Sequence, residues 1–164
     1  MIAPDKCTIR SAMIDDVAII LQLIRDLAAY ERAPSEVTAT EDQLRNVLFS
    51  KRPAAEVRLA FENETPVGFA LFFHNFSTWL GQPGLYLEDL FVKPEYRGKG
   101  YGRALLVDLA KIARERGCGR MEWAVLDWNE PAMEFYRALG AKPLDEWRTF
   151  RLTRDGIERL AQSQ

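Results

Sequence analysis

The sequence predicts a domain of the mixed α/β class, in which helices and strands alternate along the chain. Three observations lead to this class. Apolar residues recur first at helical spacing, then at the alternating spacing of strands, and then at helical spacing again. The 164 residues are enough for one domain with a full core and too few for two ordinary ones. No repeat, linker or low-complexity segment interrupts the pattern, so we expect one domain over residues 1–164.

The first part of the chain predicts a short strand and two helices. Residues 7–10 favour the strand, and apolar side chains between positions 17 and 28 return every three or four residues, which is typical of a helix. Thr40 and Gln43 have the spacing of a capping box, so a second helix should begin there. The connection between the helices, around residues 34–35, is expected to be a loop.

The middle of the chain predicts three strands. Residues 56–61 and 67–73 alternate between apolar and polar or small side chains, and the turn residues 62–65 between them indicate a hairpin. Glycine and proline predict a loop over residues 79–84. Residues 85–92 are apolar on both faces, which indicates a central strand.

The last part predicts a helix, a strand, a second helix and a final strand. Helical spacing covers residues 105–113, and alternation follows at 121–125. Asn129 is a good N-cap for a short helix that ends at Gly140. Residues 147–152 then predict the final strand.

Composition excludes several classes of protein. The formal charge of −2 argues against a nucleic-acid partner. No apolar run reaches the roughly 20 residues that cross a bilayer, and residues 1–6 lack the apolar core of a secretory signal. With Cys7, Cys118 and a single histidine, His74, a zinc site is not expected. We expect a cytoplasmic protein with reduced thiols, no bound metal and no membrane association.

A glycine-rich turn lies between the predicted central strand and the following helix. Its sequence, Arg97-Gly98-Lys99-Gly100-Tyr101-Gly102, combines permissive glycines with two cations at a helix N-terminus, which suits a pyrophosphate. The glycines run G-x-G-x-G, so neither the dinucleotide fingerprint nor the P-loop is present. Spacing alone leaves open a strand-to-helix turn that binds nothing.

This turn resembles the R-x-x-G-x-G/A motif of the GNAT superfamily of N-acetyltransferases. The resemblance implies a three-layer α/β/α fold, with a central mixed sheet and helices on both faces, and acetyl-CoA as co-substrate. Residues 27–31, 86–92 and 128–136 are similar to one branch, the diamine (spermidine/spermine) acetyltransferases and their thialysine-acetylating relatives. Members of that branch also imply a homodimer.

The resemblance assigns a set of residues to acetyl-CoA. The backbone of the central strand would bind the pantetheine arm, and one of its N–H groups would polarise the thioester carbonyl. The expected coenzyme residues are Leu90, Phe91, Val92, Arg97, Gly98, Lys99, Gly100, Tyr101, Gly102, Arg103 and Asn129.

Two adjacent acids, Glu88 and Asp89, lie in the otherwise apolar central strand. An alkylamine must lose a proton before it attacks a thioester, so the reaction needs a base. Neighbouring side chains in a regular strand point to opposite faces, unless a bulge redirects them. Both acids could instead form structural hydrogen bonds or ion pairs. The resemblance assigns Glu88 as the base, acting through water and binding the amine, and leaves Asp89 unassigned.

Tyr136 and three other residues are singled out by the resemblance alone. Tyr136, whose spacing by itself indicates a core aromatic, would protonate the coenzyme A sulfur, since a phenol titrates near pH 10. Tyr30, Glu31 and Trp79 would bind the amine together with Glu88, since carboxylates and aromatic faces attract ammonium groups.

The acceptor is expected to be a small amine: a diamine, a polyamine or a thialysine-like amino acid. Ser77 stands where a polyamine enzyme should carry an acid, which argues against spermidine. No cysteine or serine stands out as an acyl-carrying nucleophile, which favours direct transfer in a ternary complex. The alternatives are an enzyme that acetylates proteins or peptides and a catalytically silent acyl-CoA-binding module.

Overall fold

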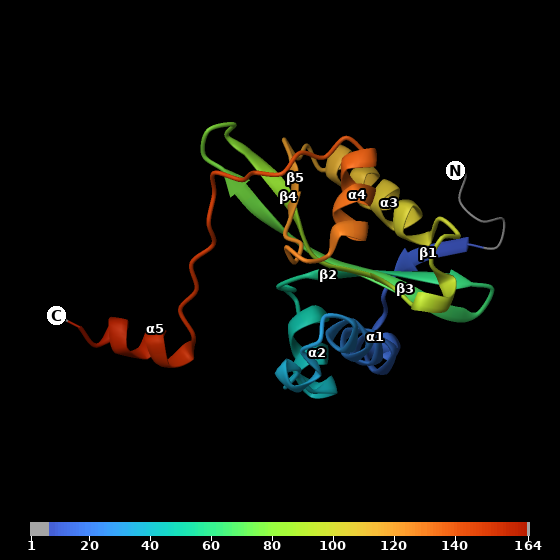
Figure 1. Cartoon of the computed structure of the whole chain (residues 1–164). Coiled ribbons are helices and arrows are strands. Elements are labelled where there is room, and N and C mark those ends of the chain that lie inside the picture. The colour runs from blue at the N-terminus through green and yellow to red at the C-terminus, as the bar shows by residue number, and fades with distance from the viewer. Residues whose placement is uncertain (1–6, 164) are drawn as a thin grey trace. The chain divides into compact units, whose positions relative to one another are not determined.

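The computed structural model describes residues 7–163, which fall into two compact units, the first ending at Ala124 and the second beginning at Val125. Figure 1 shows a sheet with helices in the first unit and two short helices in the second. The elements are β1 (Cys7–Ser11), α1 (Val17–Tyr30), α2 (Glu41–Leu48), β2 (Glu56–Glu62), β3 (Thr65–Ser77), β4 (Gln82–Val92), α3 (Tyr101–Glu115), β5 (Met121–Trp123), α4 (Glu130–Ala138) and α5 (Arg154–Ala161). Single 3-10 turns occur at η1 (Ile14–Asp16), η2 (Pro34–Glu36) and η3 (Pro94–Tyr96).

The sheet of the first unit is mixed, with the strand order β1-β2-β3-β4-β5. The first four strands pair antiparallel, whereas β5 runs parallel to β4, with Leu85 opposite Met121. Helices α1 and α2 cover one face of the sheet and α3 covers the other (Figure 1). The predicted α/β class, with helices on both faces of a mixed sheet, is therefore confirmed.

Helix α1 packs on the sheet through a stripe of apolar side chains. Ile20, Leu23 and Leu27 follow one another at helical spacing and are buried against Leu59 and Phe69 of the sheet. Helix α2 joins the same core, and its predicted capping box is present: the Thr40 amide donates to Gln43 Oε1 at 2.9 Å, and the Gln43 amide donates to Thr40 Oγ1 at 3.3 Å.

Helix α3 lies on the opposite face, where Leu105 and Leu109 are fully buried. An ion pair from Arg58 Nε of β2 to Asp108 Oδ2 of α3, at 2.6 Å, fixes the helix against the sheet. This packing sets the N-terminus of α3 next to the end of β4, where the glycine-rich turn connects them.

The structure corrects the predicted boundaries at several points. Strands β3 and β4 extend beyond the predicted runs and pair from Gln82 to Gly84, so the predicted loop 79–84 is reduced to the turn at residues 78–81. The predicted loop around residues 34–35 contains η2. Strand β5 ends at Trp123 and does not reach position 125.

The predicted final strand at residues 147–152 is wrong. Within the second unit, residues 141–153 form neither a helix nor a strand, and Phe150 is 93% exposed. Alternating side chains give strand propensity, but a strand also needs a neighbour to pair with, and no pairing occurs there among the described residues. Helix α5, which follows directly, was not predicted. No helix in the described part of the chain is long and apolar enough to span a membrane.

Candidate active site

The glycine-rich turn has the backbone geometry of an anion-binding loop. Gly98 and Gly100 adopt φ angles of +74° and +93°, in the left-handed region that other residues rarely occupy. Gly100 is the N-cap of α3, a helix of 15 residues. The first N–H groups of a helix lack intrahelical acceptors and carry a partial positive charge, so this turn can bind a phosphate group through its backbone.

Both cations of the turn contact other side chains of the first unit. Lys99 Nζ lies 3.7 Å from Glu62 Oε1 and 4.8 Å from the centroid of the Tyr96 ring. Arg97 donates from Nε to the Val92 carbonyl at 2.9 Å. The Arg97 guanidinium carbon also lies 4.1 Å from the centroid of the Tyr30 ring. The cations are thus held at the turn before any ligand arrives.

The buried side chain of Tyr101 holds the glycine-rich turn against the sheet. Its ring is 1% exposed, and its hydroxyl donates to Glu62 Oε1 at 2.6 Å. Burial, with this hydrogen bond to Glu62, raises the pKa of Tyr101 far above the ordinary value for tyrosine. The role of Glu62 could not be predicted from the sequence, since a glutamate at a hairpin turn carries no pattern that points to a residue so distant in the chain.

We expect Tyr101→Phe to lower the free energy of unfolding by about 1–2 kcal/mol, because Glu62 would lose its buried donor. Urea unfolding at pH 7 measures this change. Tyr96→Phe is the matched control: its half-buried ring packs edge-on against Tyr101, with centroids 6.2 Å apart, and the variant should stay within about 0.5 kcal/mol of wild type. Equal stability of all three proteins would contradict the anchoring role.

Strand β4 contains a bulge at Glu88. Leu71 of β3 pairs with Asp89 and Phe72 pairs with Leu87, which leaves Glu88 without a partner in the register. Paired residues on neighbouring strands point to the same face of a sheet. Leu71 packs against the core beneath α1, so Asp89 faces α1, while Leu87 shares the opposite face with Phe72.

Three carboxylates gather where the bulge meets the end of α1. Burial, with smaller contributions from the negative charges of Glu88 and Glu31, raises the pKa of Asp89 to about 6. Glu31 directly follows α1, and partial burial raises its pKa as well. Glu88 is exposed. Strongly shifted carboxyls are typical of sites that bind cations or transfer protons. The raised pKa of Asp89 could not be predicted from the sequence, because it depends on the bulge and on the packing of α1.

The turn between β3 and β4 carries the predicted substrate residue Trp79, which is 90% exposed. Ser77 at the start of the turn is buried; its hydroxyl accepts a hydrogen bond from the Leu80 amide at 3.2 Å, and its carbonyl accepts one from the Gly81 amide at 2.8 Å. Ser77 therefore has a structural role in shaping the turn, which explains a serine at this position.

The second unit holds the remaining predicted residues, Asn129 and Tyr136. Asn129 caps α4, since its Oδ1 accepts a hydrogen bond from the Ala132 amide at 3.4 Å. Tyr136 lies in the last turn of α4 and is half-buried, and the centroid of its ring is 5.4 Å from that of Phe135. Gly140, at a φ of +90°, ends this helix as predicted.

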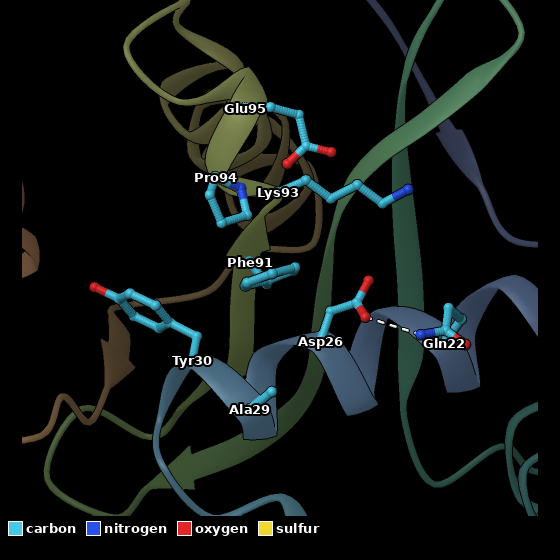
Figure 2. A pocket seen from close by; sticks show the side chains of 8 residues that line it. All are labelled: Gln22, Asp26, Ala29, Tyr30, Phe91, Lys93, Pro94 and Glu95. Atoms are coloured by element: carbon cyan, nitrogen blue, oxygen red, sulfur yellow. Dashed lines mark hydrogen bonds between the residues drawn. The ribbon is translucent and has the colours of Figure 1, made fainter.

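An open cavity of about 610 Å³ lies in the first unit between α1 and the end of β4 (Figure 2). Tyr30 and Phe91 form one part of its wall, and Asp26, Lys93 and Glu95 supply charged groups. The Arg97 guanidinium carbon lies over the Tyr30 ring and 5.6 Å from the centroid of the Phe91 ring. The cavity and the glycine-rich turn thus share an edge, and its size suits part of a small-molecule ligand.

Comparison with known proteins gives a consistent result. A family model described as the acetyltransferase (GNAT) family matches residues 20–141. A thialysine N-epsilon-acetyltransferase from Bos taurus is 42% identical, with 93% of this chain and 96% of the relative covered. An L-ornithine N5-acetyltransferase from Arabidopsis thaliana is 32% identical, covering 93% of this chain and 86% of the relative. An integron cassette protein from the mobile metagenome of V. cholerae has a similar solved structure, with a TM-score of 0.78, 29% identity, and 98% and 100% of the two chains covered.

Proposed function

The chain belongs to the acetyltransferase (GNAT) family, and we propose that it transfers the acetyl group of acetyl-CoA to a primary amine at the end of a small molecule's alkyl chain. The observation that carries this proposal is the group of three carboxylates, Glu31, Glu88 and Asp89, which interact electrostatically at the end of α1. Such a group attracts a protonated amine and can accept its proton. The named substrates of the relatives, thialysine and L-ornithine, are amino acids with a side-chain amine. Since the Ser77 hydroxyl accepts a hydrogen bond within its own turn and carries no negative charge for a polyamine, we favour an amino-acid acceptor over spermidine.

The coenzyme residues proposed for this chain are those of the glycine-rich turn and the end of β4. The left-handed glycines and the N-terminus of α3 would hold the pyrophosphate, with Arg97, Lys99 and Arg103 supplying positive charge. The backbone of residues 90–92 would bind the pantetheine arm, and Asn129 would both cap α4 and contact the coenzyme. The glycine φ angles support this fit, because a backbone with side chains could not follow this path without strain.

In the proposed mechanism the amine and acetyl-CoA bind together. Glu88, through a water molecule, takes the proton from the ammonium group, and a β4 backbone N–H polarises the thioester carbonyl. The nitrogen then forms a bond to the carbonyl carbon and the carbon–sulfur bond breaks. Tyr136 donates its phenolic proton to the departing thiolate, and the second proton that the nitrogen loses as the amide forms passes through water to restore the phenol. Glu31 and Trp79 are proposed to surround the amine, whereas the ring of Tyr30, which the resemblance assigns to the amine, lies against Arg97 of the glycine-rich turn.

We further propose that both units belong to one acetyltransferase domain, since the family match crosses the boundary between them. A homodimer in the cytoplasm is proposed from the resemblance to diamine acetyltransferases. The half-buried free thiols of Cys7 and Cys118 suit a reducing compartment.

The proposal is tested by calorimetric titration with acetyl-CoA, followed by a thiol-release assay on thialysine, L-ornithine, a diamine, spermidine and a lysine-containing peptide. We expect binding of acetyl-CoA and thiol release with at least one amino acid. Release with the peptide alone would identify a protein acetyltransferase instead. Binding without release on any acceptor would identify a silent module, and absence of binding would overturn the proposal.

Glu88→Gln is expected to lower kcat/KM for the amine by about 10- to 100-fold, because the amide cannot accept the proton. Initial rates between pH 6 and 9 measure the effect. Glu64→Gln, at the exposed turn between β2 and β3, is the control and should match wild type. A Glu88→Gln profile identical to that of wild type would remove Glu88 as the base.

A further inference from the structure

We propose that Tyr30 is a positioning residue of the coenzyme site, which holds the Arg97 guanidinium where it receives the pyrophosphate; this inference rests on the proposed function. The starting point is the contact between the end of α1 and the glycine-rich turn. The Arg97 guanidinium carbon lies 4.1 Å from the centroid of the Tyr30 ring, at the distance of a close cation–π contact. Tyr30 was selected by resemblance as an amine-binding residue, and this geometry gives it a different role.

Arg97 is fixed in two directions. Its Nε donates to the Val92 carbonyl at 2.9 Å, which ties one edge of the guanidinium to the end of β4. Its guanidinium carbon lies over the Tyr30 ring, 4.1 Å from the centroid, and 5.6 Å from the centroid of the Phe91 ring. Arg97 is exposed, so without these contacts its long side chain would sample many rotamers. An arginine that is already ordered loses less freedom when a ligand binds.

The contact leaves the phosphate-binding part of Arg97 available. Stacking uses the face of a guanidinium, whereas its N–H groups lie in the plane and point outward from the edges. With Nε engaged by Val92, the two terminal nitrogens can donate side by side to the oxygens of one phosphate. The stack on Tyr30 and the pyrophosphate can therefore be present together.

The same contact argues against an ammonium group on this face of Tyr30. Two cations cannot share one ring face without strong repulsion, and the guanidinium already lies 4.1 Å from the ring centroid. The adjacent Glu31, which interacts electrostatically with Asp89, is a more suitable partner for the amine. The consecutive residues Tyr30 and Glu31 thus have different roles: Tyr30 positions Arg97 for the coenzyme, and Glu31 binds the amine.

The test compares Tyr30→Leu with Tyr30→Phe, which keeps the ring. Affinity for acetyl-CoA is measured by calorimetry, and kcat/KM is measured with acetyl-CoA and with S-acetylpantetheine, an acetyl donor that lacks the pyrophosphate. We expect Tyr30→Leu to weaken acetyl-CoA binding about three- to tenfold. Tyr30→Phe should stay within about twofold of wild type, and neither variant should change kcat/KM with S-acetylpantetheine or the KM for the amine.

A double-mutant cycle supplies the second readout. In an Arg97→Ala background the Tyr30 substitution should have no further effect on acetyl-CoA affinity, since the two residues act through one contact. Tyr30→Met, a flexible side chain of similar bulk, replaces Tyr30→Leu if that variant folds poorly.

Unchanged acetyl-CoA affinity in the leucine variant, equal losses with both donors, additive effects in the cycle, or a change confined to the amine KM would each overturn the inference. Failure of the wild-type protein to bind acetyl-CoA would instead overturn the proposed function.

Discussion

Tyr136→Phe is expected to lower kcat by about two to three orders of magnitude while leaving the affinity for acetyl-CoA within about twofold of wild type. The substitution removes the phenolic hydroxyl and keeps the ring, so the thiolate would have to leave without this proton donor. Tyr136 lies on α4, which is well defined at both ends: Asn129 caps its start and Gly140 ends it. General acid catalysis needs the donor within hydrogen-bond reach of the atom that it protonates, and a helix capped at both ends limits the positions of its side chains.

Steady-state rates at saturating amine, together with calorimetric titration of acetyl-CoA, measure this effect. The neighbouring ring provides the control, because Phe135→Leu alters packing near Tyr136 without removing a hydroxyl. A kcat of Tyr136→Phe within about threefold of wild type would show that water or another group protonates the sulfur. An equal loss in Phe135→Leu would show that packing of α4, and not proton donation, controls the rate.

Local sequence patterns were sufficient for most of the first unit. The helical stripe of α1, the capping box at Thr40 and the alternation of β2 each depend on residues close in the chain, and each prediction is confirmed within a few residues. The strand at residues 147–152 failed for the opposite reason. Its side chains alternate, but strand formation depends on a partner that the pattern cannot specify.

The residues of the candidate site likewise differ in whether nearby or distant parts of the chain determine their roles. The glycine-rich turn could be predicted, because positions with a left-handed backbone favour glycine, and the spacing of these glycines is visible in the local sequence. The roles of Glu62 and Asp89 could not, because they come from contacts across the sheet. The role of Glu62 depends on the hydrogen bond that it accepts from a tyrosine hydroxyl on α3. Asp89 is defined by a bulge that turns it towards α1, and sequence alone left that bulge as one alternative.

Glu88 and Asp89 provide two neighbouring carboxyls with different properties. The bulge leaves Glu88 exposed, whereas Asp89 is partly buried and has its pKa raised to about 6. An exposed carboxylate is in direct contact with water and can exchange protons with it. A carboxyl whose pKa is about 6 gains its negative charge just below neutral pH, so its ionisation would strengthen the attraction of a cationic amine.

Asp89→Asn is therefore expected to abolish a pH-dependent step in activity. In wild type, kcat/KM for the amine should rise as the pH passes about 6, because Asp89 becomes ionised there. The asparagine variant should lack this rise and be about 10- to 100-fold less active at pH 8. Glu31→Gln is the matched comparison: one of the charges that raises the pKa of Asp89 is removed, so the rise should move to lower pH. A wild-type rise that persists in Asp89→Asn would assign it to another group.

The same substitution should stabilise the protein, and the sign follows from the direction of the shift. The pKa of Asp89 is about 6 in the folded protein and about 3.9 in an unfolded chain. Below the unfolded pKa the group is protonated in both states and costs nothing. As the pH rises through the folded pKa, the ionised form is progressively disfavoured by folding, and stability is lost.

Asp89→Asn avoids this loss, so its free energy of unfolding should exceed that of wild type by about 1–3 kcal/mol at pH 8 and by much less at pH 4. Urea unfolding at both pH values measures the difference. An Asp89→Asn variant that is less stable than wild type at pH 8 would show that Asp89 forms a structural bond instead of contributing a destabilising charge to the site.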